Sequence, residues 1–248
     1  MGYIIGGILF LIVVVWSFMG VGLSLPDLFG HLGRGLDTAR QFFPPDWSIT
    51  RDALSSTAET VQMAVVGTLL GALGAVPLSL FAARTTSFFP GLSSVIKTVM
   101  NVFRATPIVI YAIILTAMVG LGKATGAVAV AVGAFVMLTK LYAEALESIS
   151  AGPVEAVRAA GGNTLQVFAF GMLPQVFPGY VATTLYAFEL NLQASFILGF
   201  VGAGGIGYDL LNYTRQFQWQ KVCTILILTI VVVNVVDLIS YRIRKSIS

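Results

Sequence analysis

Long apolar stretches separated by short polar ones dominate the chain. A helix that crosses a bilayer needs about 20 mostly apolar residues. Six stretches approach or exceed that length, at 3–25, 57–83, 105–122, 124–146, 174–200 and 222–241. The pattern therefore predicts an all-α membrane protein with about six transmembrane helices.

Composition supports the same class. Of the 248 residues, 57% are hydrophobic and only 10% are charged, whereas a soluble domain has about 25% charged residues. The net charge of +3 comes without a basic run, so we expect no nucleic-acid partner. A single cysteine, Cys223, and a single histidine, His31, exclude a disulfide framework and argue against a histidine metal cluster.

The first stretch could be a signal peptide or a retained span. It lacks a basic segment before its long apolar run, which favours a retained span. Residues 26–56 are rich in turn formers and predict an external loop with an amphipathic piece. We therefore expect residues 1–56 to form the first transmembrane helix and external loop, and residues 57–248 to form the main transmembrane domain.

Small residues and prolines refine the spans. Gly67, Gly71 and Ala75 stand four apart, which places a small-residue seam on one helix face. Pro107 falls in the first turn of the predicted third span. No internal repeat is visible, which argues against an inverted-repeat secondary transporter.

Lys and Arg placement indicates the orientation. Six spans put both termini and the loop at 147–173 on one side, with eight of the 14 Lys and Arg residues. Arg242, Arg244 and Lys245 directly follow the last span, so we place that side in the cytoplasm.

The loop at 147–173 has the pattern of two short helices. Pro153 suits a first helical position, and Glu155 would then lie in the first turn. Gly161 supplies a stop, and Asn163 with Gln166 resembles a capping box for the next helix. Ala156, Ala159 and Ala160 would give the first helix a smooth surface. From the residues alone, an ordinary amphipathic linker stays an open alternative.

This loop resembles the EAA loop of ABC importer permeases. Glu155-Ala156, Gly161 and Leu173-Pro174 match its spacing, while Val157 and Gly171 replace the usual Ala and Ile. The resemblance implies that the loop is a coupling helix that docks on an ATP-binding subunit. The implied docking residues are Pro153, Glu155, Ala156, Ala159, Ala160 and Gly161.

A wider match over about 54–241 is similar to the phosphonate permease branch. It rests on residues 146–149, 152–156, 173–176, 186–191, 202–207 and 217–219. The resemblance implies a methionine-importer-permease-like core in a bacterial plasma (inner) membrane. It further implies a permease for phosphonate or a related phosphorus oxyanion, such as phosphite or phosphate.

The same resemblance implies the partners. These are an ABC ATP-binding subunit, an extracytoplasmic solute-binding protein, a second permease copy (an identical chain or a similar paralogue) and membrane lipid. ATP would be bound by the partner subunit, so we expect no catalytic residue, no metal site and no cofactor in this chain.

Residues 202–207 formally match G-x-G-x-x-G. A nucleotide fingerprint needs a βαβ unit around it, and this segment instead ends a predicted membrane helix. We interpret Gly202, Gly204, Gly205 and Gly207 as a flexible turn at the outer mouth and candidate external gate, followed by a short helix near 208–213. A tight turn with no partner is the open alternative.

The fifth span has polar residues on two sides. Thr184, Asn191 and Ser195 share one face, and Tyr186, Glu189 and Gln193 share the opposite one. Such a helix is expected to be central, so Thr184, Glu189, Asn191, Gln193 and Ser195 are candidate pathway residues. In the phosphonate branch the position of Gln193 is usually Arg.

Glu189 would lie about 20 Å from the cytoplasmic start of that span, where a charge is costly. It could serve transport, or it could form a structural ion pair, for which Arg104 is a candidate partner.

Two smaller predictions concern other spans. Lys140 and Glu144 should pair at i, i+4, and Asn234, Asp237 and Tyr241 should hold helices together.

Three other functions stay open. An intramembrane enzyme would need a nucleophile–base or paired-acid constellation, which the sequence does not show. An ion channel would not need a docking helix. An ABC permease for another small solute would share the coupling loop but not the substrate.

Overall fold

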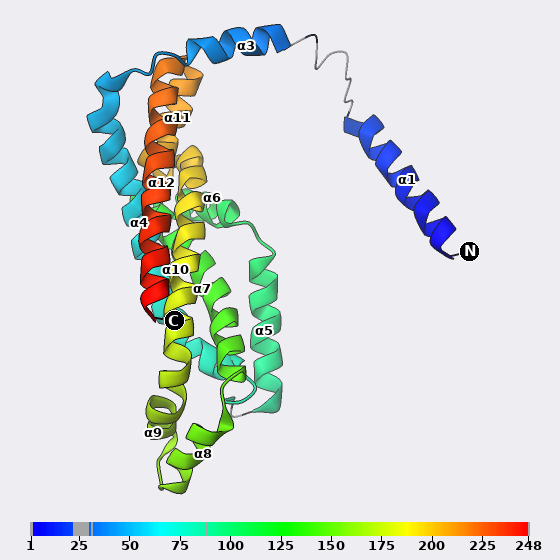
Figure 1. Cartoon of the computed structure of the whole chain (residues 1–248), viewed down its shortest axis with the longest axis vertical. Coiled ribbons are helices and arrows are strands. Elements are labelled where there is room, and N and C mark those ends of the chain that lie inside the picture. The colour runs from blue at the N-terminus through cyan, green and yellow to red at the C-terminus, as the bar shows by residue number, and fades with distance from the viewer. Residues whose placement is uncertain (1, 22–29, 31, 88, 248) are drawn as a thin grey trace. The chain divides into compact units, whose positions relative to one another are not determined.

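The computed structural model describes residues 2–21, 30, 32–87 and 89–247. Every regular element in that part of the chain is helical (Figure 1). Contacts divide the chain into two units, Met1–Pro45 and Asp46–Ser248.

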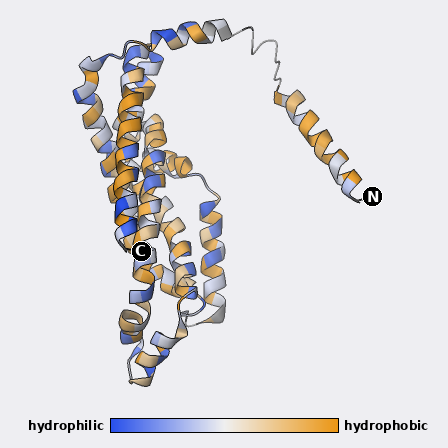
Figure 2. Cartoon of the chain, viewed as in Figure 1, coloured by the Kyte–Doolittle hydropathy of each residue, from blue (hydrophilic) through white to orange (hydrophobic). Residues whose placement is uncertain are grey.

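The first unit contains two helices, α1 (Gly2–Val21) and α3 (Leu32–Gln41). The uncharged α1 is long and apolar enough to cross a membrane from Tyr3 (Figure 2). Its predicted extension to residue 25 lies outside the described residues. The amphipathic piece expected in the external loop is α3, where Asp37 and Arg40 lie 3.6 Å apart one helical turn from each other.

The second unit holds the main helical bundle. Its elements are η1 (Trp47–Ile49), α4 (Thr50–Ala82), α5 (Pro90–Arg104), α6 (Ile108–Val119), α7 (Lys123–Glu147), α8 (Ala151–Ala159), α9 (Thr164–Gln166), η2 (Val167–Met172), α10 (Leu173–Leu198), η3 (Gly199–Ala203), α11 (Gly205–Arg215) and α12 (Trp219–Ile247).

Five helical segments of the described chain are long and apolar enough to span a bilayer, and a sixth is a bent pair. The prediction of about six spans is therefore confirmed. The observed helices overrun several predicted ends: α4 begins at residue 50 instead of 57, and α12 continues to residue 247 instead of ending at 241.

The predicted third span at 105–122 is wrong. The chain bends by 81° between α5 and α6. Proline disfavours helical backbone in the residue before it, so Pro107 stops α5 and precedes the first residue of α6. With 12 residues, α6 is about 18 Å long, too short to cross a ~30 Å hydrocarbon layer alone.

The small-residue seam on α4 is packed closely by another helix, as predicted, and that helix is α7. A Cβ on Gly67 would lie 2.5 Å from Val130 Cβ, and a Cβ on Gly71 would lie 2.5 Å from Ala134 Cβ. Ala75 continues the seam and is fully buried. Absent side chains thus let the two backbones approach, which gives the bundle its central helix pair.

The predicted domain boundary at residue 56 lies too late, because the units divide after Pro45. Ile49 and Ala53 are buried in one apolar cluster with Ile206 and Ile225. Thr224 Oγ1 also donates a hydrogen bond of 2.8 Å to the carbonyl of Asp46. These contacts place η1 and the first turn of α4 inside the second unit.

Candidate functional site

The loop between α7 and α10 projects from one end of the second unit as two short helices, α8 and α9 (Figure 1). The first helix begins at Ala151, two residues before the predicted start. Pro153 still lies in the first turn, where its missing N–H breaks no helical bond. Glu155 is the fifth residue, so the predicted first-turn carboxylate is wrong.

The end of α8 is built as predicted. Gly161 has a φ of +83°, its N–H donates to Arg158 O at 2.9 Å, and the N–H of Gly162 donates to Val157 O at 3.0 Å. This bond pair defines a Schellman motif. The capping box is also present: Asn163 and Gln166 exchange two 2.9 Å hydrogen bonds.

The six docking candidates are all exposed in the isolated chain. Pro153, Glu155, Ala156 and Ala159 lie on α8, and Ala160 and Gly161 form the turn after it. Val154 faces inward and is buried. A Cβ on Gly171 would lie 3.1 Å from Val154 Cα, so glycine at this departure from the EAA pattern lets α8 lie on η2. Leu165, 75% exposed, adds an uncovered apolar side chain to the loop.

Gln175 ties the start of α8 to α10. Its Oε1 accepts a 3.0 Å hydrogen bond from the N–H of Ser150. Its Nε2 donates to Ser150 O at 3.3 Å and to Gly171 O at 2.6 Å. These three hydrogen bonds fix the start of α8 against the base of α10.

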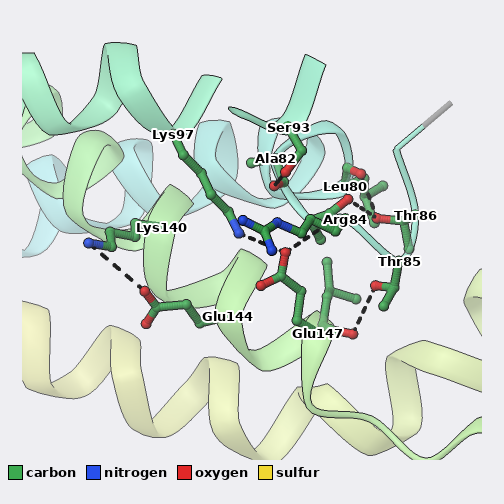
Figure 3. Close-up of polar contacts among 12 residues, drawn as sticks. Leu80, Ala82, Arg84, Thr85, Thr86, Ser93, Lys97, Lys140, Glu144 and Glu147 are labelled. Atoms are coloured by element: carbon green, nitrogen blue, oxygen red, sulfur yellow. Dashed lines mark hydrogen bonds and ion pairs between the residues drawn. The ribbon is translucent and has the colours of Figure 1, made fainter. Parts of the chain in front are cut away.

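Glu147 ties the end of α7 to two other elements (Figure 3). One carboxylate oxygen accepts hydrogen bonds of 2.7 Å from the N–H of Arg84 and from Lys97 Nζ. Beside it, Thr85 Oγ1 donates to Leu146 O at 3.2 Å. Sequence analysis missed this junction because Lys97 and Glu147 stand 50 positions apart.

The nearby Lys140–Glu144 pair is confirmed at 4.0 Å (Figure 3). Lys140 Nζ also lies 3.4 Å from Asn101 Oδ1 on α5. Together with Lys97 and Glu147, these contacts set the register between α5 and α7.

As expected, α10 is central, with contacts to α4, α7 and α12. One face of α10 points into the bundle. It carries Thr184, Asn191 and Ser195. Thr184 hydrogen-bonds to Tyr142, Asn191 Nδ2 donates to Thr68 Oγ1 at 2.9 Å, and Ser195 Oγ donates to Asn191 O at 2.7 Å. Within one protomer, this face joins helices.

Glu189 forms an ion pair, but with Arg244 and not with the expected Arg104. Glu189 Oε1 lies 2.9 Å from Arg244 Nη2, without the alignment of a hydrogen bond. Arg244 belongs to the last turn of α12, so the carboxylate lies near the level where that helix ends. Gln193, one helical turn further along the same face of α10, is exposed.

A cavity of about 440 Å³ opens between the end of α5, the start of α6, α7 and α10. Its lining includes Arg104, Thr106, Tyr111, Tyr186 and Asn191. Of the five pathway candidates, only Asn191 borders it. No pattern in the sequence predicted Arg104 at this cavity, because the bend between α5 and α6 was not predicted.

The glycine segment forms a turn and α11 follows it, as predicted. Gly202, Gly204 and Gly205 have φ values of +90°, +80° and +69°. The N–H of Gly122 donates to Gly202 O at 3.0 Å. Gly207 packs on Phe196 O, where a Cβ could not fit. The turn is thus closely packed, and its role as an external gate stays a prediction.

The stripe of Asn234, Asp237 and Tyr241 is exposed on α12. Asn234 Nδ2 donates to Ile230 O of its own helix at 2.7 Å. The prediction that this stripe joins helices is wrong for the described chain, because its side chains point out of the bundle.

Comparison with known proteins finds transport permeases of similar sequence over most of the chain. The phosphite transport system permease protein of Stutzerimonas stutzeri is 36% identical over 84% of this chain and 75% of its own length. The phosphate-import permease protein of Mycolicibacterium smegmatis is 36% identical over 75% of this chain and 35% of its own length.

An inward-facing structure of a methionine ABC transporter has the same fold. It aligns with a TM-score of 0.73 at 23% identity and covers 82% of this chain and 99% of its own. The predicted methionine-importer-permease-like core is therefore confirmed. The model of the family described as the binding-protein-dependent transport system inner membrane component matches residues 75–248. This chain therefore belongs to that family of inner-membrane transport proteins.

Proposed function

We propose that this chain is the permease subunit of an ABC importer for a phosphorus oxyanion, with phosphonate, phosphite and phosphate as candidate substrates. The observation that carries the proposal is the projecting loop, in which α8 is exposed and tied to the spans on both sides. The substrate class follows from relatives whose names specify phosphite and phosphate.

The partner on α8 is an ABC ATP-binding subunit, which binds and hydrolyses the ATP. Ala156, Ala159 and Ala160 are exposed and small, so a groove in that subunit can approach the α8 backbone closely. Gln175 of α10 holds Ser150 at the start of α8, and Glu147 at the end of α7 holds the Arg84 backbone and Lys97 of α5. Movement of the docked subunit would thereby reach α5, α7 and α10.

A second permease copy and an extracytoplasmic solute-binding protein complete the proposed transporter. Along α10, Tyr186, Leu190, Ile197 and Phe200 form an exposed, mainly apolar stripe around Gln193. This stripe suits a second permease copy enclosing the pathway. The solute-binding protein would approach the end that carries α11, opposite the coupling loop.

The test is transport by the complete complex in proteoliposomes. The chain would be purified with its ATPase and binding protein, and ATP-driven uptake of labelled phosphate, phosphite and methylphosphonate would be measured. We expect uptake of at least one of them. Uptake of methionine or glycine betaine, with none of the three, would contradict the substrate class.

Docking is tested by Ala159→Asp. A carboxylate on a closely packed face should exclude the ATPase, since overpacking and burying an unpaired charge each cost about 1–3 kcal/mol or more. Ala151→Asp adds the same charge at an exposed site of the same helix, outside the proposed docking residues, and serves as the matched control. Normal uptake by Ala159→Asp, with the ATPase still bound, would leave the permease proposal without its main structural support.

A further inference from the structure

Among the described residues, the lining of the cavity beside α10 holds one cation and no anion. Arg104 is the sole charged side chain among the described residues that border it. We propose that this cavity is a transient binding site for the transported oxyanion, and that Arg104 supplies its positive charge. The inference rests on the proposed function, and it assigns the substrate a place within the protomer.

Arg104 forms no ion pair among the described residues. A charged side chain within the spanning part of a membrane protein is costly, and it generally marks a partner or a substrate path. Glu189 and Arg244 show the first case, since they lie 2.9 Å apart. Arg104 fits the second case, a place on the substrate path.

Arg104 is exposed in the isolated chain, and the register between α5 and α7 shows at which level along the bundle it lies. Lys97 contacts Glu147 at the end of α7, and the cavity that Arg104 borders also contacts Gly133 and Met137. These two residues are 10 and 14 positions before Glu147, or about 15–21 Å along the helix. The cavity thus lies near the middle of the 25-residue α7, away from its charged end.

The bend between α5 and α6 supplies further donors. The first N–H groups of α6 carry partial positive charge and lack helical acceptors, and Ile108 at its start borders the cavity. Tyr111 Oη donates to Phe103 O at 2.7 Å and fixes the bend. A broken helix that presents such groups to a cavity suits an anionic solute.

The polar side chains around the cavity complete the match to a tetrahedral oxyanion. Thr106 and Tyr186 add hydroxyl groups to the lining. Hydrogen bonds from a guanidinium group to phosphate oxygens are charge-assisted and can be bidentate. Glu189 lies outside the lining and is paired with Arg244, so an anion in the cavity meets no free carboxylate there.

The first test compares variants of the complete reconstituted transporter. Arg104→Gln should lower uptake of labelled phosphate about tenfold or more, as expected for loss of a charge-assisted hydrogen bond. Arg104→Lys should retain part of the uptake. Complex yield should stay unchanged in both variants. Arg242→Gln, an exposed arginine near the end of α12, is the matched control.

The second test reads the local charge without transport. Thr106→Cys in a Cys223→Ser background places one thiol at the cavity. Its reaction with an anionic methanethiosulfonate should be faster than with a cationic one, and inorganic phosphate should slow it. Adding Arg104→Gln should lower the anion-to-cation rate ratio about tenfold.

Three results would overturn the proposed site. The first is uptake by Arg104→Gln equal to that of Arg242→Gln, and the second is a thiol reaction-rate ratio that Arg104→Gln does not change. The third is collapse of complex yield in both Arg104 variants, which would assign Arg104 a structural role. Failure of the proposed function looks different. In that case the wild-type complex takes up no phosphorus oxyanion, whereas the thiol still reports whether the cavity favours anions.

Discussion

Lys97 Nζ lies 2.7 Å from Glu147 Oε1, an ion pair that joins α5 to the last residue of α7 directly before the coupling loop. The same carboxylate oxygen accepts the N–H of Arg84, which follows α4. Three membrane segments therefore meet at one side chain, four positions before α8 begins.

The ion pair of Lys97 with Glu147 should contribute more to stability and to coupling than the neighbouring pair of Lys140 with Glu144. Lys97→Met leaves a carboxylate with one of its two donors, and the loss of a charged hydrogen bond costs about 1–3 kcal/mol. We expect a lower unfolding temperature in detergent and weaker solute-stimulated ATP hydrolysis. Lys140→Met is the control, because its pair with Glu144 spans 4.0 Å and is more exposed, so about 0–1 kcal/mol is expected. Equal effects would contradict the special role of Glu147.

Two glutamine variants test how α8 is held. Gln175→Glu removes the donor that reaches Ser150 O and Gly171 O and brings a carboxylate against these carbonyls, so ATP hydrolysis should lose its response to solute. Gln166→Glu is the same change at the capping box, where glutamate also accepts the N-cap N–H. It should behave as wild type. Uncoupling by both variants would point to loop charge and not to the tether.

At Gly161, in the turn after α8, the backbone conformation alone should decide which substitutions are tolerated. Gly161 has a φ of +83°, and nothing lies within 4 Å of the Cβ it lacks. Gly161→Val should therefore cost about 1–2 kcal/mol through the left-handed backbone and impair co-purification of the ATPase. Gly161→Asn should be tolerated, because asparagine adopts this conformation more readily. If both variants fail to co-purify the ATPase, the space beside Gly161 is filled by the partner subunit and backbone conformation alone is not the cause.

Local patterns predicted the parts of this fold that short-range physics determines. Apolar length gave α4, α7, α10 and α12, and the small residues of α4 gave the face that meets α7. Capping residues gave the turn from α8 into α9, because Gly161, Asn163 and Gln166 act on their own neighbours. The bent pair was missed because the apolar run at 105–122 was read as one span, although Pro107 could also start a separate short helix.

The candidate site was less predictable because it depends on contacts between distant positions. Helical periodicity sorted the polar residues of α10 correctly into two faces. It could not say that Asn191 would meet Thr68, that Glu189 would meet Arg244, or that Arg104 would face a cavity. Those partners are separated by tens of residues, and only the packing of the bundle brings them together.

The close packing of α4 on α7 at Gly71 should be essential for the stability of the bundle. Gly71→Val would place methyl groups where Ala134 Cβ and the α7 backbone already lie within 2.8 Å of the added Cβ, so we expect a loss of about 1–3 kcal/mol or more and a low yield of folded protein. Gly179→Ala on α10 is the control, since its added Cβ meets nothing within 4 Å. Thermal unfolding in detergent measures both. A stable Gly71→Val variant would mean that the helices can separate without cost.

The pair of Glu189 and Arg244 should be structural, and a double-mutant cycle can show it. Their side chains are 15% and 30% exposed, so removing one partner leaves a half-buried charge at a cost of about 1–3 kcal/mol. Glu189→Gln and Arg244→Gln should each lower the unfolding temperature, and the double variant should lose less than the sum of the two. Uptake should then follow stability across the three variants, because Glu189 lies outside the cavity that Arg104 borders. If instead Glu189→Gln is as stable as wild type but changes the solute dependence of ATP hydrolysis, its carboxylate acts in transport, and the ion pair is a consequence of its position there.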